Sequence, residues 1–432
     1  MSDTPRDGVR RTIARHGRLS TLTPARQLLR VLAVSLSVVL VSGLGVVAYA
    51  AADFGATFAA DAVVLDGQES TPPDIGALDN EGVNILFAGL DACEEEYAQY
   101  FGDGRCPEDA YYSEDSRDGV LNDVNMVVHI SPEPRKVTVI SFPRDLMIEA
   151  PECTDPQGNV TAASSYSQLN QAYYRGDLGC IATTIESFTG LSIDYAATVT
   201  WGGVIEITNA IGGVDVCIGG EGIYDEHTGL AIAPSENYTL VGVEALQFLR
   251  TRYGVGGSDL NRISNQQVYM SALARKLTSE EVLTNPGALL TLARTTLENV
   301  DPSSSLTNPV TLVQIAMAAA DVPLDEFTFV QYPVVDDPYD SNRVAPDYAS
   351  AEQLWAALDA NVAIDLSGDT GGGAVLAEGE EGTETEAPVD TTAPTESATA
   401  TPDPTETIAS GELGSNVHGT NAGQVTCSNG AG

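Results

Sequence analysis

The stretch Val83-Asn84-Ile85-Leu86-Phe87-Ala88-Gly89-Leu90 is a short apolar run bounded by a glycine and an aspartate, and such a run is typical of a buried strand. Two β-rich runs follow it, at residues 124–130 and 136–142. The segment Ser131-Pro132-Glu133-Pro134-Arg135 separates these two runs, so the pattern predicts a hairpin. We therefore expect the folded part of the chain to begin at the first strand.

Strand-like runs alternate with helical patterns along the next part of the chain. Helices are predicted at residues 182–188, 201–211, 243–249, 260–277 and 351–360, and strands at residues 193–200, 213–218 and 327–335. Alternating strands and helices favour an α/β fold in which helices flank a mixed central β-sheet.

The N-terminal part has the pattern of a membrane anchor. Residues 31–50 form an uncharged and mostly apolar run that is long enough to span a bilayer as one helix. Seven arginines precede it, which places residues 1–30 in the cytoplasm and the rest of the chain outside the cell membrane. A cleaved signal peptide is the alternative, because Ala48-Tyr49-Ala50 matches a cleavage pattern. The length of the apolar run favours the anchor, and both interpretations export the body of the protein.

The body divides into three parts by composition. Residues 51–80 are expected to form a polar extracytoplasmic stalk, and residues 81–365 one folded domain. Residues 366–432 are rich in Thr, Pro, Glu and Gly and poor in branched apolar and aromatic residues. Such a segment buries too little apolar surface to offset the entropy of ordering it, so we predict a disordered acidic tail.

Charge and cysteine usage limit the possible functions. The 432 residues include 61 acidic and 20 basic ones, and the net charge of −41 argues against nucleic acid as a partner. None of the six cysteines stands in a CxxC pair, so disulfides are expected in an exported protein. Proximity in sequence suggests Cys93 with Cys106 and Cys153 with Cys180, leaving Cys217 for Cys427, although other pairings stay open.

Arginines are concentrated at one place in this acidic body. Arg250, Arg252 and Arg262 fall within 13 residues. A helix over residues 243–249 is expected to lead into an extended segment, in which Arg250 and Arg252 would point the same way. Arg262 and Gln266 would share a face of the next helix. Convergent guanidinium groups match the oxygens of phosphate or pyrophosphate, although each arginine could instead neutralise a nearby carboxylate.

Two aspartates lie at predicted strand ends. Asp91 closes the first strand, and Asp123 immediately precedes the second. Two carboxylates with few other ligands suit Mg²⁺, which keeps several waters and is completed by substrate phosphates. The alternative is that both are loop or cap residues. His129, which lies inside a predicted strand, is expected to be a core or sheet residue rather than a catalyst.

Several stretches, taken in order, resemble the LytR-CpsA-Psr family of cell-wall glycopolymer ligases. They are Asn84–Asp91, Asn122–Ile130, Val137–Asp145, Leu169–Tyr173, Ala245–Tyr253, Asp259–Arg262 and Gln266–Gln267. Together they span roughly half of the chain, from residue 83 to about residue 280. No single stretch is diagnostic, but the ordered set is specific.

The resemblance implies a function and a set of site residues. Members of the family are single-pass membrane proteins whose extracytoplasmic α/β domain transfers a glycan phosphate from a polyprenyl-pyrophosphate carrier to peptidoglycan or another cell-wall acceptor. Asp91 and Asp123 would hold Mg²⁺ or Mn²⁺. The residues expected at the pyrophosphate are Arg144, Arg250, Arg252, Arg262 and Gln266, with Asp145 and Asp259 orienting an arginine. Asp259 is also expected to be the N-cap of its helix.

The sequence also departs from the family pattern. Leu121-Asn122-Asp123-Val124 stands where Arg-Ser-Asp-Thr is common, and Gln168 stands where a lysine is frequent. Two charges that the resemblance implies are therefore absent, unless Arg117 or Arg175 replaces them. A lipid-pyrophosphate phosphatase and a non-catalytic lipid-binding regulatory protein are the alternative functions.

Overall fold

The computed structural model describes residues 62–65, 82–100, 106, 111, 119–279, 282, 286–320, 322–366, 370–377, 411–414 and 416–431. The predicted cytoplasmic segment and membrane helix, and nearly all of the predicted stalk, lie outside these residues. Within the described ranges, every helix is too short or too polar to cross a bilayer.

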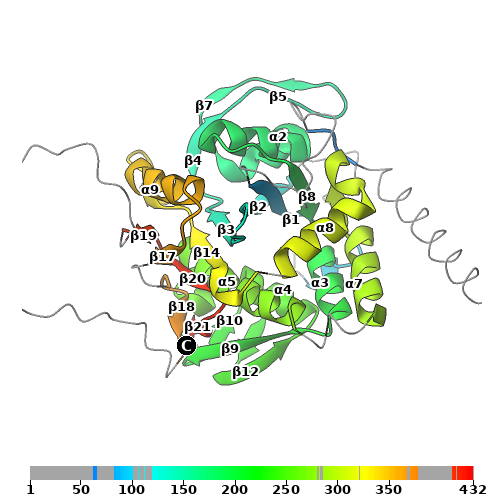
Figure 1. Cartoon of the computed structure of the whole chain (residues 1–432), viewed down its shortest axis with the longest axis vertical. Helices are drawn as coiled ribbons and strands as arrows, with labels where there is room; N and C mark the ends of the chain where they lie inside the picture. The colour runs from blue at the N-terminus through cyan, green and yellow to red at the C-terminus, as the bar shows by residue number, and fades with distance from the viewer. Residues whose placement is uncertain are drawn as a thin grey trace, which may run out of the picture. The chain divides into compact units, whose positions relative to one another are not determined.

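Seven strands form the main sheet, in the order β13-β8-β1-β2-β3-β14-β20. Their bounds are β1 (Val83–Asp91), β2 (Leu121–Ile130), β3 (Val137–Phe142), β8 (Tyr195–Val199), β13 (Val300–Pro302), β14 (Phe327–Gln331) and β20 (Gly419–Asn421). Strands β1, β2 and β3 are antiparallel neighbours, whereas β8 runs parallel to β1 and β14 runs parallel to β3. The predicted hairpin and the mixed central sheet are therefore confirmed (Figure 1).

Helices cover both faces of this sheet. The α-helices are α2 (Ala172–Thr189), α3 (Trp201–Ala210), α4 (Val243–Arg250), α5 (Asp259–Leu277), α7 (Pro286–Glu298), α8 (Pro309–Ala320) and α9 (Tyr348–Asp359). Short 3-10 helices are η2 (Ala98–Tyr100), η4 (Leu169–Gln171), η5 (Tyr253–Val255), η6 (Ser304–Thr307) and η7 (Leu324–Glu326).

The alternation of side chains along β1 divides the core in two. Leu86 packs in one cluster with Ile181 of α2 and Leu354 of α9. Its neighbour Ile85 packs in a second cluster that includes Ala318 of α8. Because successive side chains of a strand point to opposite faces, one apolar strand supplies both clusters.

The remaining strands form small sheets beside the main one. Their bounds are β4 (Met147–Ala150), β5 (Cys153–Thr154), β6 (Val160–Thr161), β7 (Ser164–Gln168), β9 (Val214–Gly220), β10 (Ile223–Asp225), β11 (Leu230–Ile232), β12 (Ser235–Leu240), β15 (Val334–Asp336), β16 (Val344–Pro346), β17 (Ile364–Leu366), β18 (Ala374–Leu376), β19 (Gly411–Leu413) and β21 (Thr426–Gly430). A four-stranded sheet has the order β12-β9-β21-β18. The predicted strand 327–335 is thus two strands, β14 and β15.

The prediction of disorder from residue 366 onward is wrong for residues 366, 370–377, 411–414 and 416–431. Strand β20 completes the edge of the main sheet, and β21 lies between β9 and β18. Backbone hydrogen bonds and a disulfide hold these segments, and their few apolar side chains, Leu413, Val417 and Ala422, are buried in the two core clusters. So sparse an apolar content gave no sign of the fold in the sequence. Residues 378–410 lie outside the described residues.

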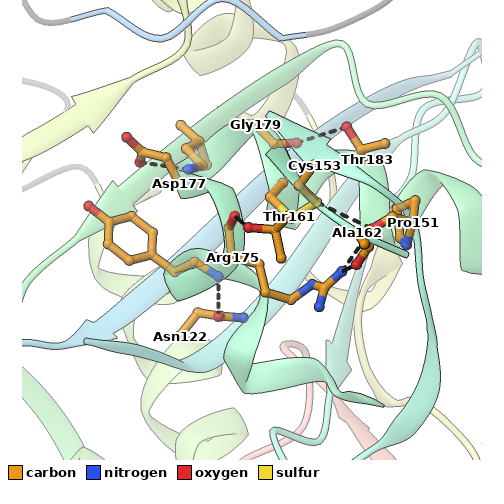
Figure 2. The surroundings of a disulfide bond; sticks show 12 residues. Asn122, Pro151, Cys153, Thr161, Ala162, Arg175, Asp177, Gly179 and Thr183 are labelled. Atoms are coloured by element: carbon orange, nitrogen blue, oxygen red, sulfur yellow. Dashed lines mark hydrogen bonds between the residues drawn. A yellow bond between two sulfur atoms is a disulfide. The ribbon is translucent and has the colours of Figure 1, made fainter. Parts of the chain in front are cut away.

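All three predicted disulfides are present. They join Cys93 to Cys106, Cys153 to Cys180, and Cys217 to Cys427. The second links β5 to α2 (Figure 2), and the third links β9 to β21 across 210 positions of sequence. The long-range bridge is the one that fixes the C-terminal strand to the domain.

Candidate functional site

A β-bulge sets the position of Asp123. Gly89 pairs with Val124 and Leu90 pairs with Asn122, so Asp123 is the extra residue of β2 at this point. Asp91 is the last residue of the neighbouring strand β1, and both aspartates therefore lie at the same end of the sheet. Bulges re-aim a side chain at the edge of a site, and the Asp123 side chain is buried here.

Asp123 and Asp259 hold two arginines that come from different parts of the chain. Arg144, which follows β3, places its Nη1 atom 2.5 Å from Asp123 Oδ2 and its Nε atom 3.3 Å from Asp259 Oδ1. Arg262 of α5 places Nη2 2.8 Å from Asp259 Oδ1 and donates from Nη2 to the Asp123 carbonyl at 3.1 Å. We call Asp123, Arg144, Asp259 and Arg262 the arginine cluster.

The cluster keeps Arg144 charged. Burial alone would lower the pKa of this guanidinium group, but the carboxylates of Asp123, Asp259 and Asp145 outweigh burial and raise it. A permanently charged, fork-shaped donor is thereby fixed at the end of the sheet.

Several buried arginine donors form no hydrogen bond within the described part of the chain, although Arg144 Nε lies within ion-pair distance, 3.3 Å, of Asp259 Oδ1. They are the Nε atoms of Arg144, Arg252 and Arg262. An unmet buried N–H group is costly, and such groups in a native protein commonly await a ligand or an ion. Three guanidinium Nε–H groups of this kind suit the oxygens of an anion.

The segment after α4 differs from the prediction. Arg250 is the last residue of α4, and its guanidinium carbon lies 5.0 Å from the ring centre of Trp201. Only Thr251 is extended, because η5 begins at Tyr253. The expected extended run from Arg250 to Tyr253 is therefore wrong, and alternation along a strand gives no reason for Arg250 and Arg252 to point the same way.

Buried Asp225 of β10 causes this sharp change of direction. Its Oδ2 atom accepts hydrogen bonds from Thr251 Oγ1 at 2.7 Å, from the Arg252 N–H at 3.0 Å and from the Tyr253 N–H at 3.2 Å. Burial would raise the pKa of Asp225, but these hydrogen bonds and others lower it below its usual range. A carboxylate that binds three successive donors fixes the turn that presents Arg252.

Asp259 is not the N-cap of α5. Ser258 Oγ accepts the hydrogen bond of the Asn261 N–H at 3.0 Å, so Ser258 caps the helix and Asp259 is its first residue. The Asp259 carboxylate is thereby left to pair with arginines, as the resemblance had implied. On the same helix, Gln266 Nε2 donates to the Leu249 carbonyl at 2.9 Å and ties α5 to the end of α4.

Asp145 connects the arginine cluster to Arg343, a residue that was not predicted from the sequence. Its Oδ1 atom accepts from Arg343 Nη1 at 2.5 Å and from Gln168 Nε2 at 2.6 Å, while Oδ2 lies 3.7 Å from Arg144 Nε. Arg343 lies 198 positions from Asp145 in the sequence, and no local pattern announces it. The tertiary structure thus supplies a further arginine next to Gln168, where the family pattern has a lysine.

Arg175 lines the same cavity as Gln168 and Arg343, and main-chain carbonyl groups hold it there. Its Nη2 atom donates to the carbonyl groups of Pro151 at 3.0 Å and Ala162 at 2.8 Å, beside the Cys153–Cys180 disulfide (Figure 2). Arg117, the other suggested replacement, lies outside the described residues.

The metal prediction rests on the two aspartates alone. Among the described residues, no three His, Cys, Asp or Glu side chains form a group that could hold a metal ion. Asp91 Oδ1 accepts a hydrogen bond from Trp201 Nε1 at 2.8 Å, and Asp123 Oδ1 has only a 3.4 Å contact from Asn170 Nδ2. Two carboxylates at one end of neighbouring strands fit Mg²⁺, since this ion takes its remaining ligands from water and phosphate.

His129 lies away from this chemistry, at the opposite end of β2. It is buried, and its Nδ1 atom is hydrogen-bonded to Asn84 Oδ1 at 2.8 Å. The interpretation of His129 as a core residue is confirmed.

Comparison with known proteins agrees with the fold. The family model described as "LytR_cpsA_psr family" matches residues 56–360. The chain is 30% identical over 280 residues to the cell wall biosynthesis protein LcpA of Corynebacterium glutamicum, which covers 60% of this chain and 51% of LcpA. It thus spans about half the length of that relative.

Two further matches cover a larger share of the matched protein. The polyisoprenyl-teichoic acid–peptidoglycan teichoic acid transferase TagV of Bacillus subtilis is 23% identical over 317 residues, or 72% of each chain. The crystal structure of protein gbs0355 from Streptococcus agalactiae aligns with a TM-score of 0.50 at 17% identity, over 67% of this chain and 92% of that one. The structural likeness concerns the fold alone.

Proposed function

This chain belongs to the LytR_cpsA_psr family, and from that premise we propose that it is a phosphotransferase that moves a glycan phosphate from a polyprenyl-pyrophosphate carrier to a cell-wall acceptor. Peptidoglycan is the acceptor we favour, and a glycosylated surface protein is the other. The names of two matched relatives, one a cell wall biosynthesis protein and one a teichoic acid transferase, support this class of reaction.

One observation carries the proposal. The Nε–H groups of Arg144, Arg252 and Arg262 are buried without a hydrogen-bond partner among the described residues, although carboxylates hold two of the three arginines in place. A pyrophosphate group offers the several oxygens that such donors need. These buried donors support a dianionic ligand at this site.

The reaction would need little from the protein beyond position and charge. A hydroxyl oxygen of the acceptor attacks the phosphorus that carries the glycan, and the bond from that phosphorus to the bridging oxygen breaks. Polyprenyl phosphate leaves with the bridging oxygen and the electron pair, and the hydroxyl proton passes to a base, for which the carboxylates of the site are the available groups. Arginines that neutralise the leaving group are suited to this role.

Asp91 and Asp123 are the residues that would hold Mg²⁺ or Mn²⁺. A divalent ion there would neutralise charge on the pyrophosphate oxygens. Arg144 would then serve two tasks, because it pairs with Asp123 and would also contact the pyrophosphate. We further propose that the apolar run at residues 31–50 anchors the chain in the cell membrane as a single pass, with the N-terminus in the cytoplasm and the domain outside.

The proposal is tested by following the glycan. Full-length protein in detergent micelles is incubated with a synthetic prenyl-pyrophosphoryl disaccharide, Mg²⁺ and a peptidoglycan oligomer. Wild type is compared with Arg252→Ala and with the control Arg294→Ala, whose side chain is 66% exposed on α7. We expect the acceptor to be labelled by wild type and by the control, and about 10²–10³-fold more slowly by Arg252→Ala.

Other outcomes would identify a different function. Glycan phosphate released without an adduct on the acceptor would indicate a phosphatase. If wild type converts the donor in neither way but still binds it, the chain is a lipid-binding protein and the transferase proposal fails.

A further inference from the structure

A second polar cavity lies next to the arginine cluster. It has a volume of about 360 Å³ and is bounded by β7, the start of α2 and the loop between β15 and β16. Its lining includes Tyr166, Gln168, Arg175, Tyr339, Asp340 and Arg343. The mechanism proposed above does not use this cavity.

Two tyrosines form one wall of the cavity in a fixed arrangement. The rings of Tyr166 and Tyr339 meet edge to face with centres 5.9 Å apart, yet Tyr339 remains 85% exposed. Buried Asp337 connects them, because its Oδ1 atom accepts from the Tyr166 hydroxyl at 2.8 Å and from the Tyr339 N–H at 2.8 Å. An exposed aromatic ring that is held in place by a buried carboxylate is a prepared contact surface.

Two arginines also line the cavity and supply positive charge. Arg175 forms no ion pair with a carboxylate in the part of the chain that the structure describes, and its Nε atom is buried there without a hydrogen bond. Arg343 is one-third exposed and lies 3.9 Å from Asp340. The cavity thus combines two guanidinium groups with two aromatic rings.

Arg343 and Gln168 connect this cavity to the reaction site. Both hydrogen-bond to Asp145, and the other oxygen of that carboxylate lies 3.7 Å from Arg144 Nε. A molecule in the cavity is therefore separated from the arginine cluster by a single side chain.

We propose that this cavity binds a sugar ring that bears an acidic substituent, as part of a glycan substrate. The faces of a sugar ring carry C–H groups that pack on aromatic rings, while its hydroxyls bond to amides and carboxylates and its acid group pairs with arginine. The inference rests on the proposed function, since a glycan next to the pyrophosphate site is its premise. The ring belongs to the acceptor or to the donor, and these two sources share this chemistry.

The test measures binding without turnover. Full-length protein in detergent is titrated with an N-acetylglucosamine–N-acetylmuramic acid disaccharide as the acceptor probe, and separately with a prenyl-pyrophosphoryl disaccharide as the donor probe. Tyr339→Ala and Arg175→Gln are compared with wild type and with the control Tyr348→Ala, because Tyr348 is also exposed, at 69%, and does not line the cavity. Calorimetry gives the dissociation constants.

We expect both cavity variants to bind one probe about five- to tenfold more weakly and the control to bind it like wild type. Loss of affinity for the acceptor probe alone assigns the cavity to the acceptor, and loss for the donor probe alone assigns it to the donor glycan. Unchanged affinity for both probes overturns the proposal. Failure of the transferase proposal would appear differently, as absence of labelled acceptor with wild type in the transfer assay.

Discussion

Strand β2 has buried polar residues at both ends, and the two ends are built differently. At one end, Asp123 pairs with Arg144 and accepts from Arg262 through its carbonyl group, while guanidinium Nε atoms remain without hydrogen bonds in the described structure. At the other end, His129 bonds to Asn84, whose side chain in turn donates to a carbonyl at 2.8 Å. The first end holds charge ready for a ligand, whereas the second closes its hydrogen bonds within the protein.

This difference predicts that substitutions at the Asp123 end of β2 change the rate of glycan transfer more than substitutions at the His129 end. We expect Arg262→Lys to lower the rate of glycan transfer about 10²–10³-fold, because lysine keeps the charge beside Asp259 but loses the planar fork that a pyrophosphate needs. The measurement is the initial rate of acceptor labelling, together with a thermal melt to show that the fold persists.

Arg294→Lys is the matched control, since Arg294 pairs with Glu298 on the surface of α7. A transfer rate for Arg262→Lys within a factor of a few of the control would place the pyrophosphate elsewhere.

A smaller loss of transfer rate is expected for a change at Asp225, because this residue holds the turn that precedes Arg252 and has no proposed contact with the substrate. Asp225→Asn keeps the size of the side chain but weakens the bonds that hold the Thr251 hydroxyl and the Arg252 N–H. We expect kcat to fall about ten- to a hundredfold through misplacement of Arg252, and KM for the donor to rise with it. Steady-state kinetics with varied donor concentration checks this split.

The stability of Asp225→Asn relative to wild type should also depend on pH, which a residue acting only through substrate binding would not cause. Because the pKa of Asp225 in the fold lies below its ordinary value of 3.8, its carboxylate stabilises the fold above that value and loses this effect as the pH falls through the folded pKa. Wild type should therefore resist urea better than Asp225→Asn at pH 7, and this difference should shrink on acidification toward pH 3. A difference that persists unchanged in acid would contradict the assignment.

The neutral end of β2 should affect stability and leave the chemistry alone. Burial lowers the pKa of His129, with a small opposing effect of Asp359, so the imidazole is neutral in the fold. As the pH falls below the ordinary value of 6.5, the unfolded chain gains a proton that the fold excludes, and the free energy of unfolding decreases.

We expect His129→Gln to cost about 1 kcal/mol of unfolding free energy at pH 8, through its hydrogen bond to Asn84, and to reduce the loss of stability between pH 7 and pH 5. Urea titrations at the three pH values measure both effects. We expect His129→Gln to transfer glycan at the wild-type rate. A large fall in this rate would contradict the purely structural role of the His129 end of β2.

The sequence predicted the parts of the fold that depend on local patterns. The strand pair at residues 124–142 and the apolar run at Val83 were recognisable, because alternating and continuous apolar runs report burial directly. Two of the three disulfides followed from short spacing and the third by elimination. Within the arginine cluster, Arg262 was named from the spacing of arginines and Asp123 from its place at a strand end, whereas Arg144 was named only through the family resemblance.

Contacts between residues far apart in the sequence could not be predicted from a local pattern. Arg343 reaches Asp145 only because the β15–β16 loop passes beside it, and a lone arginine in an acidic loop resembles any solvated charge. Strands β20 and β21 are polar and glycine-containing, and they join their sheets through main-chain groups that every residue possesses. Asp259 was misassigned as a cap because Ser258, one residue earlier, is an equally good one.

The position of β21 sets an order of events during synthesis. Ser428 of this strand donates to Asn265 of α5 at 2.6 Å in the buried interior, and Cys427 is bonded to Cys217. The helix that carries Arg262 is therefore backed by residues that the ribosome adds more than 160 positions later. Until that stretch has been synthesised and Cys427 has bonded to Cys217, α5 lacks this backing, so the helix that carries Arg262 reaches its final packing only late in folding.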